Sequence, residues 1–177
     1  MKLAIIYATT EGQTRKIARF AADRLTEDGH SVELVGVHDA DDLGLSRFDG
    51  ALLAGSVHLG RYQKELSGFA KAHAEELSKL STLFLSVSLS AAGDDPEDWK
   101  GLEDCLARFS GETGWTPTRT EHVAGAFRFT EYDFFRAWAM RWIADSKGEE
   151  LKRDEDKEYT DWAKLGSVLD EWAASLA

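Results

Sequence analysis

The chain has 177 residues, of which 43% are hydrophobic, and a size and composition of this kind predict one globular domain over residues 1–177 with a full core. A formal net charge of -11 argues against general nucleic-acid binding. The single cysteine, Cys105, excludes an internal disulfide and a cysteine-based metal cluster, and no metal site is expected. No segment is long and apolar enough to span a bilayer and the N-terminus is typical of a core strand, which together predict a cytoplasmic protein.

The first element is a short apolar run, Leu3 to Tyr7, which predicts a buried parallel strand. A hydroxyl-rich turn over residues 9–14 follows, and then a predicted helix that Gly29 ends. The unpaired N–H groups and the dipole at such a helix start attract anions, and Gly12 lets the backbone approach a ligand closely. The hydroxyls of Thr9, Thr10 and Thr14 can donate to a phosphate. The alternative is an ordinary N-cap made by Thr9 or Thr10.

Two common nucleotide motifs are excluded for this turn. It contains no lysine and no Gly-Lys-Ser/Thr, so it is not a Walker loop, and it lacks the three spaced glycines of the dinucleotide fingerprint. What remains is a phosphate monoester held by neutral donors, which points to FMN.

Further along the chain, strands alternate with helices. The apolar pattern predicts later strands at Ser31–Val37, Ala51–Ser56, Thr82–Val87 and His122–Phe127, and helices at Gln63–Leu80, within Asp94–Gly114 and at Asp161–Leu176. This alternation predicts an α/β fold with a five-stranded, parallel, doubly wound sheet. Ligands bind outside the carboxyl ends of such strands, so the turns after the first, third and fourth strands are expected to meet around the ligand.

Two reactive residue types within the helices are expected to be structural. His73 lies on or beside the apolar face of its predicted helix, where a histidine with its hydrogen bonds satisfied is commoner than a ligand. Cys105 fits the apolar face of the next helix, with no histidine near it in the sequence.

Five stretches carry a likeness to a known family: Glu11–Arg15, Gly55–Ser56 with Gly60 and Tyr62, Ser86–Leu89, Ala124–Arg128 and Tyr159–Trp162. The first resembles the phosphate loop of flavodoxins. Over nearly its full length the chain is similar to the bacterial flavodoxin-type protoporphyrinogen oxidases, the menaquinone-dependent protoporphyrinogen IX dehydrogenases. This resemblance implies the strand order 2-1-3-4-5, an FMN cofactor, oxidation of protoporphyrinogen IX in haem biosynthesis, and a quinone as electron acceptor.

The resemblance also implies the residues around the cofactor. The phosphate is expected on the first turn, with the flavin ring flanked by the later turns and Tyr62 against the isoalloxazine. The implied cofactor-binding residues are Thr9, Thr10, Glu11, Gly12, Gln13, Thr14, Ser56, Val57, His58, Leu59, Gly60, Tyr62, Ser88, Leu89, Ser90, Ala91, Gly93, Gly125 and Phe127. His58, Arg61 and Arg128 are candidates for substrate contact, because a histidine can donate a hydrogen bond and arginines can pair with propionates. Leu59 stands where the family has an aromatic residue.

An aromatic-rich stretch over Phe127–Ile143, with an expected extra helix, distinguishes the chain from a plain flavodoxin. One interpretation is a docking surface for porphyrin, quinone or the inner face of the cell membrane, where the arginines would meet propionates or lipid phosphates. The other is packing on the sheet edge or in a homodimer interface.

Other functions compete with the oxidase. A soluble flavodoxin-type electron carrier would exchange electrons with protein partners, which an acidic rim formed by Asp94, Asp95, Glu97 and Asp98 would suit. An NAD(P)H:quinone reductase would need a nicotinamide pocket, for which no motif is present. A non-redox interaction module would leave the three specialised turns without a purpose.

Overall fold

The computed structural model describes residues 1–127 and 157–176. Its centre is a parallel five-stranded sheet in the order β2-β1-β3-β4-β5. The strands are β1 (Lys2–Tyr7), β2 (Ser31–Gly36), β3 (Gly50–Ser56), β4 (Ser81–Ser88) and β5 (Arg119–Ala124). This topology confirms the predicted fold class and strand order.

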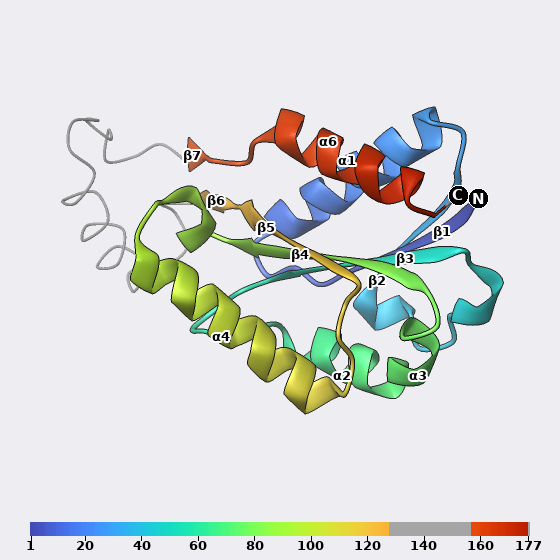
Figure 1. Ribbon diagram of the computed structural model, residues 1–177, viewed down its shortest axis with the longest axis horizontal. Coiled ribbons are helices and arrows are strands. Elements are labelled where there is room, and N and C mark those ends of the chain that lie inside the picture. The colour runs from blue at the N-terminus through green and yellow to red at the C-terminus, as the bar shows by residue number, and fades with distance from the viewer. Residues whose placement is uncertain (128–156, 177) are drawn as a thin grey trace.

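Helices cover both faces of the sheet (Figure 1). On one face lie α1 (Gln13–Glu27) and α6 (Trp162–Ala174), and on the other lie α2 (Lys64–Ala72), α3 (Ala74–Leu77) and α4 (Pro96–Thr113). Short 3-10 turns, η1 (Val37–Asp39), η2 (Leu45–Arg47) and η3 (Ser90–Ala92), lie in the connections. No helix within residues 1–127 and 157–176 has the length and apolar character needed to cross a membrane.

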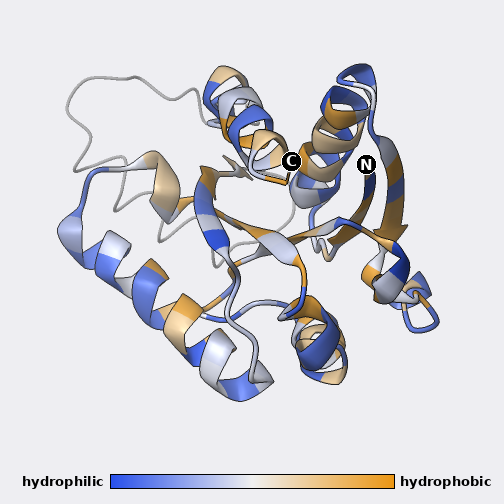
Figure 2. Ribbon diagram, turned by 45° about the vertical axis from the view of Figure 1, so that its right-hand side comes forward, coloured by the Kyte–Doolittle hydropathy of each residue, from blue (hydrophilic) through white to orange (hydrophobic). Residues whose placement is uncertain are grey.

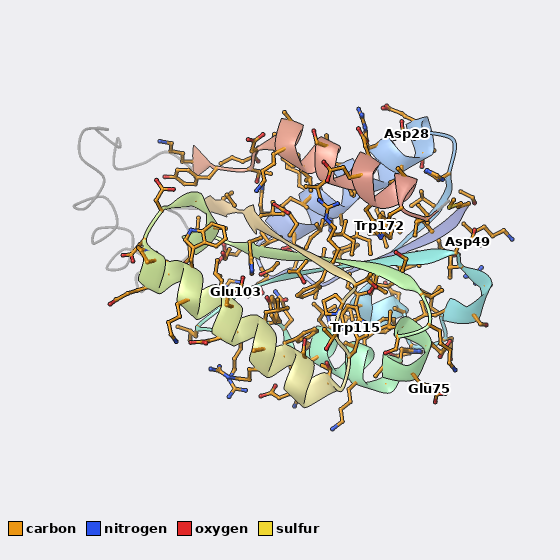
Figure 3. All side chains as sticks on the ribbon, in the orientation of Figure 1. Asp28, Asp49, Glu75, Glu103, Trp115 and Trp172 are labelled. Carbon is orange, nitrogen blue, oxygen red and sulfur yellow. The ribbon has the colours of Figure 1, made fainter. Side chains whose placement is uncertain are left out.

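The alternation of side chains along each strand divides the core into two layers. Leu3 and Ile5 of β1 pack against α1 and α6, whereas Ala4 and Ile6 face the opposite layer. Apolar colours accordingly concentrate on the strands, and hydrophilic colours on the outer sides of the helices (Figure 2). Two fully buried tryptophans mark the layers, Trp172 in one and Trp115 in the other (Figure 3).

Two helices begin with the aspartate cap that the sequence pattern favours. Asp95 accepts a hydrogen bond from the backbone N–H of Glu97 at the start of α4, and Pro96 occupies the first helical position. Asp161 accepts from the N–H of Lys164 at the start of α6. These caps satisfy N–H groups that the helices themselves leave unpaired.

Two predicted elements differ in the structure. The helix predicted over 63–80 is divided into α2 and α3 at His73, whose ring packs on Phe69 and whose Nδ1 lies 3.1 Å from Glu76 Oε1. These contacts are structural, as expected for this histidine. The strand predicted over 122–127 begins earlier, at Arg119, and ends at Ala124.

Beyond Gly125 the chain leaves the main sheet. Residues Ala126–Phe127 form β6, which pairs antiparallel with β7 (Lys157–Glu158). Gly125 makes the corner: its N–H donates to the carbonyl of Ser88, and its own carbonyl accepts from the N–H of Tyr159. The chain therefore departs and returns at the carboxyl edge of the sheet.

Candidate cofactor site at the carboxyl edge of the sheet

The first turn follows β1 directly and holds a backbone conformation that favours glycine. Gly12 has φ of 90°, in the left-handed region, and its N–H donates to Thr9 Oγ1 over 2.9 Å. Ala8 N–H still bonds to Ala54 O of β3, so the turn starts from a fixed point. Thr10 is exposed and Thr14 is buried. The turn is therefore a preformed loop at the sheet edge.

The start of α1 differs from the starts of α4 and α6. Its N-cap, Gly12, provides no side-chain acceptor, whereas α4 and α6 each begin under an aspartate. A 15-residue helix whose first N–H groups lack a side-chain cap is a suitable seat for an anion. The alternative predicted from the sequence, a threonine cap, is not found, because Thr9 Oγ1 bonds to the N–H of Gly12 itself.

The turn after β3 is a tight two-residue reversal. His58 N–H donates to Arg61 O and Arg61 N–H donates to His58 O, over 2.8 and 3.0 Å. Leu59 and Gly60 lie between them with φ of 50° and 71°, the signs that a type I′ turn requires. Leucine is unfavourable in this left-handed region of backbone conformation. Leu59 is also 83% exposed, so burial of its side chain does not offset the strain. Strained backbone conformations of this kind cluster at ligand-binding and active sites.

Helix α4 holds the same turn from the side. Arg108 Nη1 donates to the carbonyl of Gly60 over 3.1 Å, and Arg61 Nη1 lies 3.6 Å from Glu112 Oε1. The Arg61 side chain remains mostly exposed, and an exposed ion pair of this kind is weak enough to exchange for another anion. His58 is half-buried beside it.

Tyr62 lies in the core, and the expectation that it stacks on the flavin ring receives no support from its surroundings. It is 7% exposed and packs edge-on against Phe84 and Phe109, with ring centroids 5.0 Å away in each case. Its hydroxyl donates to Ser86 Oγ over 2.8 Å. Burial raises the pKa of Tyr62 above its ordinary value, against the opposing effect of the Ser86 hydrogen bond. Its neighbour Cys105 is likewise a core residue, as predicted.

Gln63 joins the first turn to the turn after β3. Its Oε1 accepts from the N–H of Ser56, and its Nε2 contacts Ser56 Oγ and lies 3.3 Å from Thr10 Oγ1. Sequence reasoning placed Gln63 only at the start of a helix. Nothing local marks its role, because Thr10 is 53 positions away along the chain.

The turn after β4 completes the edge. Ser88 Oγ accepts from the N–H of Ala91 and closes η3, while Trp99 Nε1 donates to the carbonyl of Gly93. A Cβ at Gly125 would meet Val87 Cγ1 at 3.4 Å, so this corner packs closely against the end of β4. The predicted residues of this turn, Leu89, Ser90, Ala91 and Gly93, are all half-buried.

The structure thus places the three predicted turns at one edge of the sheet. The parallel register puts the ends of β1, β3 and β4 next to one another, and Val57 N–H bonds to Val87 O across the last pair. The half-buried Glu11 lies in the first turn. The candidate substrate residue Arg128 and nearly all of the predicted aromatic, membrane or dimer contact over 127–143 lie outside the described residues; of Phe127, the structure describes the backbone.

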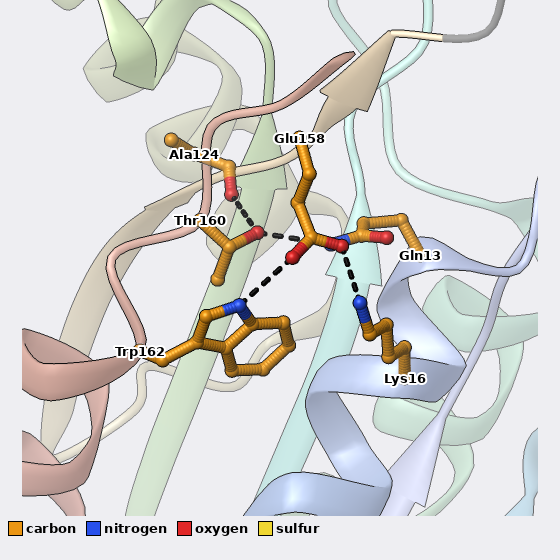
Figure 4. A network of polar contacts seen from close by, with 6 residues as sticks. All are labelled: Gln13, Lys16, Ala124, Glu158, Thr160 and Trp162. Atoms are coloured by element: carbon orange, nitrogen blue, oxygen red, sulfur yellow. Dashed lines mark hydrogen bonds and ion pairs between the residues drawn. The ribbon is translucent and has the colours of Figure 1, made fainter. Parts of the chain in front are cut away.

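A polar network lies beside the first turn of α1 (Figure 4). Glu158 accepts hydrogen bonds from Gln13, Lys16 and Trp162, and Thr160 joins Gln13 to the end of β5. The stretch 159–162 helped to carry the family likeness, but no role for it followed from the sequence. The partners of Glu158 and Thr160 on α1, Gln13 and Lys16, lie more than 140 positions away along the chain, which is why local pattern could not reveal them.

The strain at Leu59 leads to a stability prediction. Replacing Leu59 with asparagine creates the Asn-Gly pair that type I′ turns favour, and should raise the free energy of unfolding by about 0.5–1 kcal/mol. Urea denaturation of the two proteins measures the difference. A destabilised variant would mean that the leucine side chain itself holds the turn.

Comparison with known proteins shows the family to which the chain belongs. A model described as a flavodoxin domain matches residues 4–154. Protoporphyrinogen IX dehydrogenase (quinone) of Escherichia coli strain K12 is 30% identical over 174 residues, covering 98% of this chain and 95% of that protein. A Leishmania major protein with the same name is 26% identical over 98% of this chain and 75% of its own length.

Solved structures resemble the chain in fold. Oxidised flavodoxin 1 from Bacillus cereus aligns with a TM-score of 0.58 at 16% identity, covering 100% of both chains. The flavodoxin of Streptococcus pneumoniae TIGR4 gives a TM-score of 0.58 at 18% identity, over 99% of each chain. The chain therefore shares the overall fold of these flavodoxins.

Proposed function

Because the chain belongs to the flavodoxin domain family and its cofactor is FMN, we propose that it oxidises protoporphyrinogen IX to protoporphyrin IX with a quinone as electron acceptor. The observation that carries the proposal is the 30% identity to a protoporphyrinogen IX dehydrogenase (quinone), which extends over almost the whole of both chains. An FMN enzyme of this kind is an oxidoreductase, and the proposal concerns its substrate and its electron acceptor.

The residues at the carboxyl edge suit FMN. The uncapped start of α1 and the hydroxyls of Thr9, Thr10 and Thr14 are neutral donors for a phosphate monoester, and Gly12 keeps the backbone open to it. When bound, FMN supplies the two-electron chemistry, and the protein has to bind, orient and tune it. The residues predicted to flank the ring, Ser56–Gly60 and Ser88–Gly93, belong to the two later turns.

Two side chains of the turn after β3 suit a porphyrinogen or quinone. Leu59 offers an exposed apolar surface in a strained conformation, and next to its turn Arg61 offers a guanidinium whose partner, Glu112, is also exposed. A porphyrinogen combines an apolar macrocycle with propionates, so this pairing of leucine and arginine is complementary to it. His58 in the same turn can donate a hydrogen bond to substrate.

The test is an anaerobic assay of the FMN-loaded protein with protoporphyrinogen IX and menadione, followed by porphyrin fluorescence against a flavin-free control. We expect a flavin-dependent rise above the uncatalysed rate. Arg61→Gln should raise KM about tenfold through loss of a charge-assisted contact. Arg47→Gln is the matched control, because Arg47 is an exposed arginine paired with Glu33 outside these turns.

A second function is favoured by one observation. Asp94, Asp95 and Glu97 are exposed at the start of α4, beside the turn after β4, and such a rim suits a basic protein partner. Tight FMN binding without porphyrin formation would favour an electron carrier of the flavodoxin type. Its signature would be salt-sensitive reduction of a basic redox protein.

A further inference from the structure

Glu158 gathers polar contacts from two elements that are far apart in the sequence. Its Oε2 accepts from Gln13 Nε2 over 3.1 Å and from Lys16 Nζ over 2.6 Å, both on the first turns of α1. Its Oε1 accepts from Trp162 Nε1 over 2.8 Å. Three donors thus converge on one carboxylate at the end of β7 (Figure 4).

The amide nitrogen of Gln13 uses both of its protons in this arrangement. Besides Glu158, its Nε2 donates to Thr160 Oγ1 over 2.9 Å, and the Thr160 hydroxyl in turn donates a hydrogen bond to the carbonyl of Ala124 over 2.7 Å. An amide nitrogen has two protons to donate, so both are engaged. The buried Gln13 side chain therefore braces the start of α1, and its contribution to a phosphate must come from the backbone N–H.

Contacts with the Trp162 ring extend the attachment by one more turn. Lys16 Nζ lies 5.1 Å from the centre of the Trp162 ring, and that ring packs on Phe20 with centroids 4.9 Å apart. The segment from Glu158 to Trp162 thus holds α1 from Gln13 to Phe20.

The carboxylate of Glu158 is in its charged form at neutral pH. Burial alone would raise its pKa, but the hydrogen bonds from Lys16, Trp162 and Gln13 outweigh burial and hold the pKa below the ordinary value. A charged acceptor makes each of these hydrogen bonds stronger than a neutral one would.

We propose that Glu158 is a positioning residue of the FMN phosphate site, acting through Gln13 on the first turn of α1. The inference rests on the proposed placement of the phosphate at that turn. Backbone N–H groups can meet phosphate oxygens only if the helix start is held in place, and Gln13 supplies the first helical N–H. The loop precedes Gln13 in the sequence, whereas Glu158 and Thr160 hold its side chain from the C-terminal part of the chain.

The experiment compares FMN with riboflavin, which lacks the phosphate, in the full-length protein. Glu158→Ala should raise the Kd for FMN about tenfold and leave the Kd for riboflavin unchanged. Glu121→Ala is the matched control, because Glu121 Oε1 pairs with Lys164 Nζ over 2.6 Å and this ion pair ties β5 to α6 and not to α1. Both affinities should be unchanged in that variant, and Glu158→Gln should recover part of the FMN affinity.

Three results would overturn the inference. Equal losses for FMN and riboflavin would mean that Glu158 supports the fold in general. Unchanged FMN binding would separate Glu158 from the site, and tighter binding would mean that Lys16, once released, binds the phosphate itself. Failure of the proposed site has a different signature, because the unaltered protein would then bind FMN no better than riboflavin.

Discussion

Replacing Gly12 with valine should weaken FMN binding about 5- to 150-fold, because a β-branched residue at this φ costs about 1–3 kcal/mol. Gly12 has φ of 90° at the start of α1. The variant can relieve the strain only by leaving that conformation, which moves the N–H groups that we propose to bind the phosphate. Titration of the apoprotein with FMN, followed by flavin fluorescence, measures the loss.

The opposite end of α1 provides the matched control. Gly29 has φ of 88°, and a Cβ there would meet nothing within 4 Å. Gly29→Val introduces the same backbone strain away from the carboxyl edge and should leave the FMN affinity unchanged. Equal affinity losses in both variants would show that strain in α1, and not its position at the first turn, weakens binding.

Replacing Tyr62 with alanine should lower the free energy of unfolding by about 3–5 kcal/mol, because it leaves a cavity between Phe84 and Phe109. Tyr62→Phe keeps the ring and removes only the hydroxyl that donates to Ser86, so it should cost about 1 kcal/mol. Urea denaturation of the three proteins gives these differences.

The same tyrosine also tests where the flavin lies. Tyr62→Leu keeps an apolar side chain in the core and removes the aromatic ring. Under conditions in which this variant is folded, we expect its FMN affinity and visible flavin spectrum to match those of the unaltered protein. A clear loss of affinity would indicate that the Tyr62 ring contacts the flavin, and would contradict a purely structural role for this buried residue.

Much of the fold could be predicted from local pattern. Apolar runs such as Leu3–Tyr7 mark buried parallel strands, and Pro96 after Asp95 marks a helix start. These signals are local because a strand or a cap is made by neighbours in the sequence. The strand order itself came from the family resemblance. One boundary error arose at His73, whose contacts with Phe69 and Glu76 lie at the break between α2 and α3. The other arose at Gly125, which distant residues, Ser88 and Tyr159, hold at the corner where the chain leaves the main sheet.

The candidate site likewise combines features with a local sequence signal and features set by contacts between distant residues. The glycine and hydroxyls of the first turn and the alternation of strands and helices could be recognised from residues a few positions apart. Only the tertiary structure placed Tyr62 in the core, joined Gln63 to Thr10 and brought Glu158 to Gln13. Those contacts depend on which strands are neighbours and on how the helices pack, so residues as far as 145 positions apart become partners without any local signature.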